Sequence, residues 1–174
     1  MPDARHSLIR EGLLTGIVGA AVLALWYFVI DMSAGHPLRT PSTLGALALH
    51  GPDGVPPGVY PMGVLVATLI HGAAFAAFGI GLTALVHAAA RELAWRMGLV
   101  IGLVVALGFS AGLMFAIAPW TGERFPSWVI VAGSAAGAAA MLVFLWRRHP
   151  KLAKSFRDVP LGDETESPPH PRGR

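Results

Sequence analysis

Four long apolar segments constrain this chain more than any other feature of its sequence. The first, Gly12–Ile30, holds 19 residues without a charge, which extend about 28 Å as a helix at 1.5 Å per residue. The second is Met62–Val86, the third Met97–Ala118 and the fourth Trp128–Trp146. A helix needs about 20 apolar residues to cross a hydrocarbon layer of about 30 Å. The sequence therefore predicts an all-α, polytopic membrane protein with four transmembrane helices.

The composition agrees with lipid as the main solvent. Charged residues make up 13% of the 174 residues, whereas soluble domains average about 25%. We expect one bundle over residues 12–148, between an N-terminal segment 1–11 and a tail 149–174. The chain has no cysteine, which excludes disulfide exchange, iron–sulfur clusters and thiolate zinc sites. No metal-ligand spacing stands out either, so we expect no metal site.

The basic residues predict the orientation of the four helices. Cytoplasmic loops carry an excess of Lys and Arg. If the chain crosses four times, the side that holds both termini has nine basic residues near the membrane, and the other side has only Arg39 and Arg124. The nine are Arg5, Arg10, Arg91, Arg96, Arg147, Arg148, Lys151, Lys154 and Arg157. We therefore expect both termini in the cytoplasm and the protein in a bacterial inner membrane.

The first outer loop, residues 31–60, is predicted to contain a short helix on the membrane surface. Thr40 is a suitable N-cap and Pro41 a suitable first helical residue, and Gly51 and Pro52 end the segment. Leu44 and the residues one turn later give this helix an apolar face, as interfacial helices have.

Asp31, His36 and Arg39 bring an acid, a base and a cation together within nine residues of this loop. A hydrolytic site would also need a positioned nucleophile, and no such motif accompanies them. We expect Asp31 to end the first helix and to pair with Arg39. The three residues are then a docking or folding feature of the outer loop, and no catalytic residue is predicted.

Glycines four residues apart occur on three of the predicted helices. In lipid, helices associate through close backbone approach and van der Waals contact, which small residues permit. We expect these pairs to pack the bundle and, on some faces, to meet another protein. They are Gly12 and Gly16, Gly98 and Gly102, Gly108 and Gly112, and Gly133 and Gly137.

His71 is the only ionisable side chain deep within a predicted span. Such residues are functional candidates, and this imidazole could bind a haem iron or a chlorophyll magnesium. Ala67 lies four residues earlier, which resembles the Ala-x-x-x-His arrangement of light-harvesting antenna helices. The alternative is a neutral histidine bonded to a carbonyl or to a hydroxyl such as that of Thr68 or Ser110. No cofactor is expected in that case.

The tail begins with a basic segment that predicts contact with anionic lipid headgroups. Its basic residues alternate with the apolar Leu152 and Phe156. An acidic and then proline-rich sequence follows, of a composition typical of disorder. The residues expected at the headgroups are Arg147, Arg148, Lys151, Lys154 and Arg157.

The stretch Glu11–Ala46 resembles the N-terminal signature of small four-helix bacterial inner-membrane proteins of uncharacterised function. The shared features are the Glu-Gly-Leu start, a Trp-aromatic-x-x-x-Asp helix end and a Gly-x-Pro-Leu-x-Thr-Pro turn. The resemblance implies no activity. It does imply that the outer-loop residues act in folding or docking.

These features favour a non-catalytic accessory or scaffold subunit of a larger inner-membrane complex, respiratory or photosynthetic. Its expected partners are other membrane subunits and anionic lipids, and no motif for nucleic acid is present. Two alternatives stay open. One is a haem- or chlorophyll-binding protein that uses His71. The other is a homo-oligomeric channel or carrier, lined by the few polar residues of the spans, Thr15, Thr68, Ser110 and Ser134.

Overall fold

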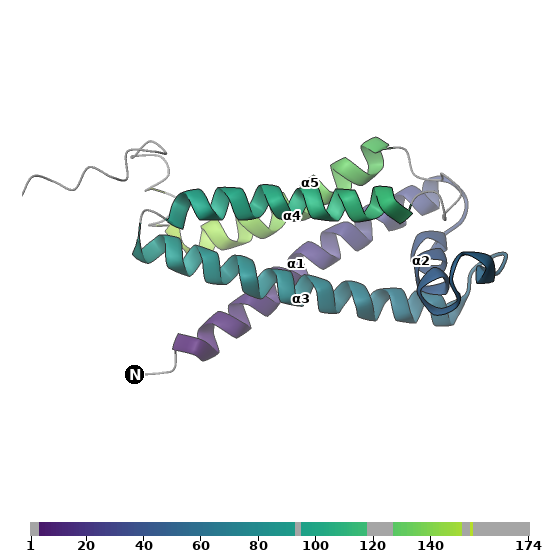
Figure 1. Ribbon diagram of the computed structural model, residues 1–174, viewed down its shortest axis with the longest axis horizontal. Coiled ribbons are helices and arrows are strands. Elements are labelled where there is room, and N and C mark those ends of the chain that lie inside the picture. Colours follow the sequence, from purple (N-terminus) through teal and green to yellow (C-terminus); the bar gives the residue numbers. More distant parts are fainter. Residues whose placement is uncertain (1–3, 93–94, 118–126, 151–153, 155–174) are drawn as a thin grey trace, which may run out of the picture.

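The computed structural model describes residues 4–92, 95–117, 127–150 and 154 (Figure 1). Over these residues the chain is helical and forms no strand, so the predicted all-α class is confirmed. The elements are α1 (Ala4–Ser33), α2 (Arg39–His50), a short 3-10 helix η1 (Pro52–Gly54), α3 (Pro61–Arg91), α4 (Trp95–Ile117) and α5 (Ser127–Arg148).

Three of the described helices are long and apolar enough to cross a membrane. They are Leu8–Ser33, Pro61–Arg91 and Ser127–Arg148. In α4 the described apolar stretch is shorter, Trp95–Val105. The chain is therefore a helical membrane protein, and the crossing of α4 stays a prediction.

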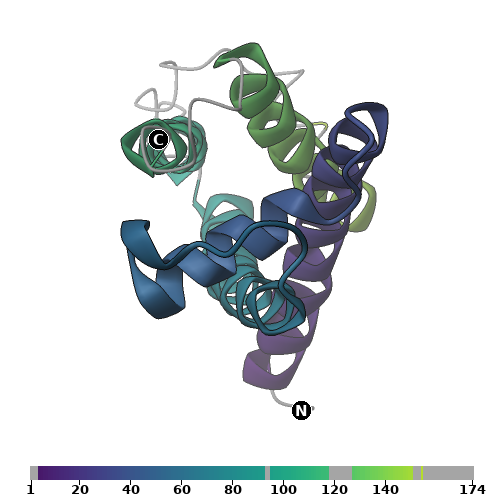
Figure 2. The ribbon, with the colours of Figure 1, turned by 90° about the vertical axis from the view of Figure 1, so that its right-hand side faces the viewer.

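The four long helices pack in a ring. Helix α1 packs on α3 and α5, and α4 packs on the other sides of α3 and α5. Figure 1 shows the start of α1, the end of α3, the start of α4 and the end of α5 at one end of the molecule. We call this the basic end, after Arg10, Arg91, Arg96, Arg147 and Arg148. At the opposite end, the α2 end, α2 crosses in front of α3 (Figure 2).

Helices α1 and α3 cross at very close range because both carry glycine at the crossing. A Cβ atom built on Gly79 would lie 2.3 Å from the Gly12 carbonyl oxygen and 2.4 Å from the Gly16 nitrogen. A Cβ on Gly16 would lie 2.3 Å from the carbonyl oxygen of Phe75. Real Cβ atoms cannot approach backbone this closely, so the crossing requires glycine at these positions.

The other glycine pairs differ in their surroundings. A Cβ on Gly133 would meet the Trp26 ring at 2.6 Å, and one on Gly137 would lie 3.6 Å from the Gly19 carbonyl oxygen. A Cβ on Gly102 would lie 2.9 Å from Leu85. The remaining three have no close contact with another helix among the described residues: Gly98 approaches only Trp95 of its own helix, and Gly108 and Gly112 have no described atom within 4 Å.

Two apolar clusters fill the bundle. One joins α3, α4 and α5 toward the basic end and contains Leu82, Val86, Ala89, Leu99, Met141 and Leu145. The other joins α1 and α5 toward the α2 end, around Leu23, Tyr27 and Val129. There the Trp26 indole nitrogen donates to the Val129 carbonyl at 3.0 Å, which gives a half-buried donor its partner.

Replacement of Gly79 by alanine should weaken the α1–α3 crossing. The new methyl group collides with backbone atoms that cannot rotate away, and such overpacking costs about 1–3 kcal/mol. The free energy of unfolding in mild detergent measures the loss. Gly81→Ala, two residues along the same helix and with no atom within 4 Å of its Cβ position, is the matched control. Equal stability of the two variants would contradict this description of the crossing.

Candidate functional site

The carboxylate of Asp31 is buried and accepts hydrogen bonds from within the outer loop. One oxygen accepts the Thr40 backbone N–H at 2.7 Å, and the other accepts the Thr40 hydroxyl at 2.6 Å. The expected pairing of Asp31 with Arg39 is therefore wrong. The carboxylate instead takes the place of a capping side chain at the start of α2, because the N-cap residue, Leu38, makes no side-chain cap hydrogen bond. The predicted N-cap role of Thr40 is also wrong, because α2 begins at Arg39, two residues before the predicted start at Pro41.

His36 and Arg39 lie in the same turn but do not complete a catalytic arrangement with Asp31. The backbone N–H of His36 donates to the Asp31 carbonyl at 3.0 Å, and that of Arg39 donates to the His36 carbonyl at 3.2 Å. His36 is exposed and Arg39 is half-buried. Both oxygens of Asp31 are bonded to Thr40, so this carboxylate stabilises the conformation of the loop. Its role in docking stays a prediction.

Helix α2 packs on α3 through its small residues. Its buried residues are Thr40, Ser42, Thr43, Gly45 and Ala46. A Cβ on Gly45 would collide with the backbone of Gly63 in α3, and the Ser42 hydroxyl accepts the Tyr60 N–H at 2.7 Å. The predicted apolar face around Leu44 is only half-buried. It is left on the outer side of α2, where an interfacial helix would meet lipid.

His71 bonds across the α1–α3 interface. Its Nε2 lies 3.2 Å from the Ala20 carbonyl oxygen, and its ring lies 4.6 Å from that of Phe75. The hydroxyl of Thr68 donates to the Val64 carbonyl of its own helix, and the side chain of Ser110 lies outside the described residues. Because a carbonyl only accepts, Nε2 carries the proton in this contact. A metal ion in a macrocycle would have to bind Nδ1 or displace the carbonyl.

A second polar cluster, which the sequence reasoning missed, lies at the basic end. Glu11 places one carboxylate oxygen 2.9 Å from Nε2 of His87 and the other 3.0 Å from Nε2 of His149. The two imidazole rings are 5.0 Å apart and meet edge to face. All three side chains are partly buried. The three ligand-type atoms lie within 4.8 Å of one another, which is the close spacing that ligands of one metal ion require.

The α1–α3 interface positions Glu11 and His87. Gly79, Thr83 and His87 are spaced four residues apart and so share one face of α3. On α1, the Thr15 hydroxyl donates to the Glu11 carbonyl at 2.9 Å and lies 3.4 Å from the Thr83 hydroxyl. Along α3, the close crossing at Gly79 is therefore followed by the polar contact of Thr83 and then by His87 of the cluster. His149, the residue that follows α5, completes the cluster.

The cluster has a signal in the sequence. Each of its members is the first residue beyond a predicted boundary: Glu11 precedes Gly12, His87 follows Val86 and His149 follows Arg148. The four-span topology already places all three on one side of the membrane. That they converge laterally could not be inferred, because the rotation of each helix about its axis is set by packing.

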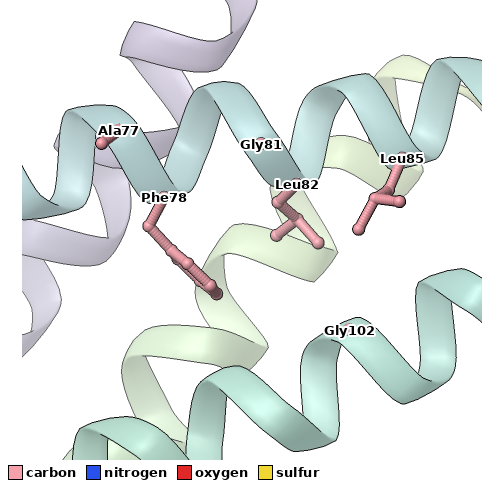
Figure 3. Close-up of a pocket in the computed structure, with 6 residues that line it drawn as sticks. All are labelled: Ala77, Phe78, Gly81, Leu82, Leu85 and Gly102. Atoms are coloured by element: carbon pink, nitrogen blue, oxygen red, sulfur yellow. The ribbon is translucent and has the colours of Figure 1, made fainter.

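An apolar groove opens between α3 and α4, with a volume of about 380 Å³. Figure 3 shows Phe78, Leu82 and Leu85 pointing from α3 toward α4, where Gly102 faces them. The lining contains no ionisable side chain. The groove therefore offers space to an apolar chain and no group for catalysis.

The predicted headgroup residues lie at the basic end as far as they are described. Arg147 and Arg148 are exposed at the end of α5, and the Arg148 guanidinium lies 5.0 Å from the centre of the Phe144 ring. Lys154 is exposed. Lys151 and Arg157 lie outside the described residues.

The predicted channel-lining residues do not share one surface. Thr15 and Ser134 are buried, whereas Thr68 is exposed. A pore lined by all of them would need a different packing of α1 and α5.

Comparisons with known proteins find no match for the chain among family models, curated proteins or solved structures.

Replacement of Asp31 by alanine should destabilise the outer loop. It leaves the backbone N–H and the hydroxyl of Thr40 without their acceptor, and an unsatisfied buried donor costs about 1–3 kcal/mol. We expect faster proteolysis within α2 and a lower free energy of unfolding in mild detergent. Asp53→Ala, an exposed acid of the same loop, is the control. If Arg39→Ala were as harmful as Asp31→Ala, the cap described above would be wrong.

Proposed function

We propose that this chain is a four-span protein of the bacterial inner membrane and a non-catalytic accessory subunit of a larger membrane complex. The observation that carries the proposal is the outer face of α4. This face is exposed along the described part of the helix and consists of Ile101, Val104, Val105, Gly108, Gly112 and Phe115. A glycine pair lies in its middle.

The surroundings of the glycine pairs support this assignment. Helix α3 packs directly against Gly12 and Gly16, and the Trp26 ring packs against Gly133. Gly108 and Gly112 have the same spacing, but no described atom approaches them. Lipid-facing positions gain nothing from glycine, which weakens a helix by about 1 kcal/mol relative to alanine. Glycine is favourable where a helix of another chain packs, because the small residue lets that helix approach the backbone closely.

The polar side chains of the spans fit a non-catalytic role. Asp31 is bonded to Thr40, and His71 is near the Ala20 carbonyl. Thr68 donates to the carbonyl four residues earlier. In hydrocarbon such groups need internal partners, and each of these has one that serves the fold. Pigment binding at His71 and a homo-oligomeric channel remain the alternatives.

The four-span topology predicts which single cysteines a membrane-impermeant maleimide reaches in spheroplasts. The chain has no cysteine of its own, so each label reports one position. Pro57→Cys, in the exposed part of the outer loop, should be labelled directly. Lys154→Cys and Arg10→Cys should be labelled only after the membrane is opened. Labelling of Lys154→Cys but not of Arg10→Cys in intact spheroplasts would contradict an even number of crossings, and labelling of both would contradict the predicted orientation.

Gly112→Leu should release the protein from its complex. The added side chain covers the exposed glycine position on α4, while the described internal contacts stay as they are because no described neighbouring atom lies within 4 Å of a Cβ there. Native membranes are extracted with mild detergent and separated by size, with an in-line absorption spectrum. We expect the wild type to migrate with larger chains and Gly112→Leu to migrate alone. Gly72→Leu, an equally open glycine on α3, should behave as the wild type.

The same separation distinguishes the alternatives. A small coloured particle that loses its colour in His71→Ala would favour pigment binding. A colourless homo-oligomer would favour the channel. Either result would overturn the accessory-subunit proposal.

A further inference from the structure

We propose that Glu11, His87 and His149 form a binding site for one divalent first-row transition-metal ion, represented here by Zn²⁺. The three side chains come from α1, from α3 and from the residue that follows α5. They meet at the basic end of the bundle. This inference does not depend on the docking of α4, which contributes no ligand.

The distances between the ligand atoms are close to those that an ion requires. Zinc lies about 2.0–2.2 Å from imidazole nitrogen and carboxylate oxygen, so tetrahedral ligands are about 3.3–3.6 Å apart. His87 Nε2 lies 2.9 Å from one Glu11 oxygen and His149 Nε2 lies 3.0 Å from the other, and the two nitrogens and one carboxylate oxygen all lie within 4.8 Å of one another. Small rotations of the side chains therefore suffice to surround an ion.

The chemistry of the set suits such an ion. Imidazole nitrogen binds zinc, copper, iron and nickel, and a carboxylate adds a negative charge. Two histidines and one glutamate are a known zinc ligand set that leaves the fourth position open for water or another ligand. Binding uses the ionised carboxylate and neutral imidazoles.

The surroundings provide both shelter and access. The side chains of His87 and His149 are 23% exposed and that of Glu11 is 12% exposed. Partial burial reduces competition from water, and the remaining exposure leaves a path for the ion. Most of the described charges at this end are basic: Arg10, beside Glu11, is exposed, and Arg96 is fully buried at the start of α4. Glu92, which follows α3, is acidic and exposed. Among the three proposed ligands only Glu11 carries a negative charge, so it is the ligand whose charge matters most.

A hydrogen-bonded cluster without metal is the competing explanation. In it, both histidines donate an Nε2 proton to Glu11, one to each oxygen. One histidine would be enough to give the carboxylate a partner. The second brings another imidazole 5.0 Å from the first, with the same nitrogen directed at the same carboxylate. An ion would bind both nitrogens at once, and the metal titration below distinguishes it from the two hydrogen bonds.

The experiment uses the full chain in detergent or nanodiscs, stripped with a chelator and then titrated with Zn²⁺. Calorimetry gives the affinity, and elemental analysis after gel filtration gives the number of ions per chain. Co²⁺, added in place of Zn²⁺, reports the ligand geometry by its visible absorption. The variants are His149→Ala, which lies outside the helix ladder and disturbs the fold least, and Glu11→Gln, which keeps the shape but removes the charge. His50→Ala, an exposed histidine of the α2 end, is the control.

We expect one ion per chain in the wild type and in His50→Ala. The affinity should fall at least about 100-fold in His149→Ala and Glu11→Gln, since loss of an outer-shell partner alone costs about 10–100-fold. Zn²⁺ should also raise the melting temperature of the wild type and not that of the variants. If the variants bind Zn²⁺ as the wild type does, or if they lose stability while no metal binds to the wild type, the proposal is overturned and the cluster is only hydrogen-bonded.

Discussion

The close crossing of α1 and α3 is the contact on which the rest of the structure depends. No hydrophobic force draws helices together in lipid, so they must gain from dispersion and from hydrogen bonds at short range. Gly12, Gly16 and Gly79 bring the two backbones into direct contact. On one side of the crossing His71 reaches the Ala20 carbonyl, and on the other Thr15 meets Thr83. Neither polar contact could form if side chains held the two helices apart.

Three polar contacts form one ladder along this interface. From His71 toward the basic end, the rungs pair His71 with Ala20, Thr83 with Thr15 and His87 with Glu11. Such contacts add about 0.6 kcal/mol each in measured cases, because the separated helices also find partners. Their larger effect is on geometry. Each rung fixes the rotation and register of α1 on α3, so that Glu11 emerges beside His87.

The helical class and the membrane environment could be predicted from the sequence, because both follow from apolar length and scarce charge. Helices α1, α3 and α5 begin earlier and end later than the predicted spans, and α1 includes Arg10 and Glu11, which precede the first predicted span. The cap that Asp31 provides could not be predicted, because its partner, Thr40, depends on how the loop turns. The Glu11, His87 and His149 cluster was missed for a related reason. A search by spacing finds ligands on one helix, whereas His87 and His149 follow Glu11 by 76 and 138 residues in the sequence.

The exposed face of α4 and the cluster of Glu11, His87 and His149 lie on separate elements, and this separation has a physical cause. Helices α1, α3 and α5 are held by glycine contacts, by the Trp26 bond to Val129 and by the polar ladder. Helix α4 makes apolar contacts to α3 and α5 and adds only Leu99 to the buried cluster at the basic end. The polar contacts between α1 and α3 do not involve α4, so the far side of α4 can be shaped for another helix without disturbing the ladder. The metal-type cluster, in contrast, requires the rigid crossing, because a shift of one residue in register would turn Glu11 about 100° away from His87.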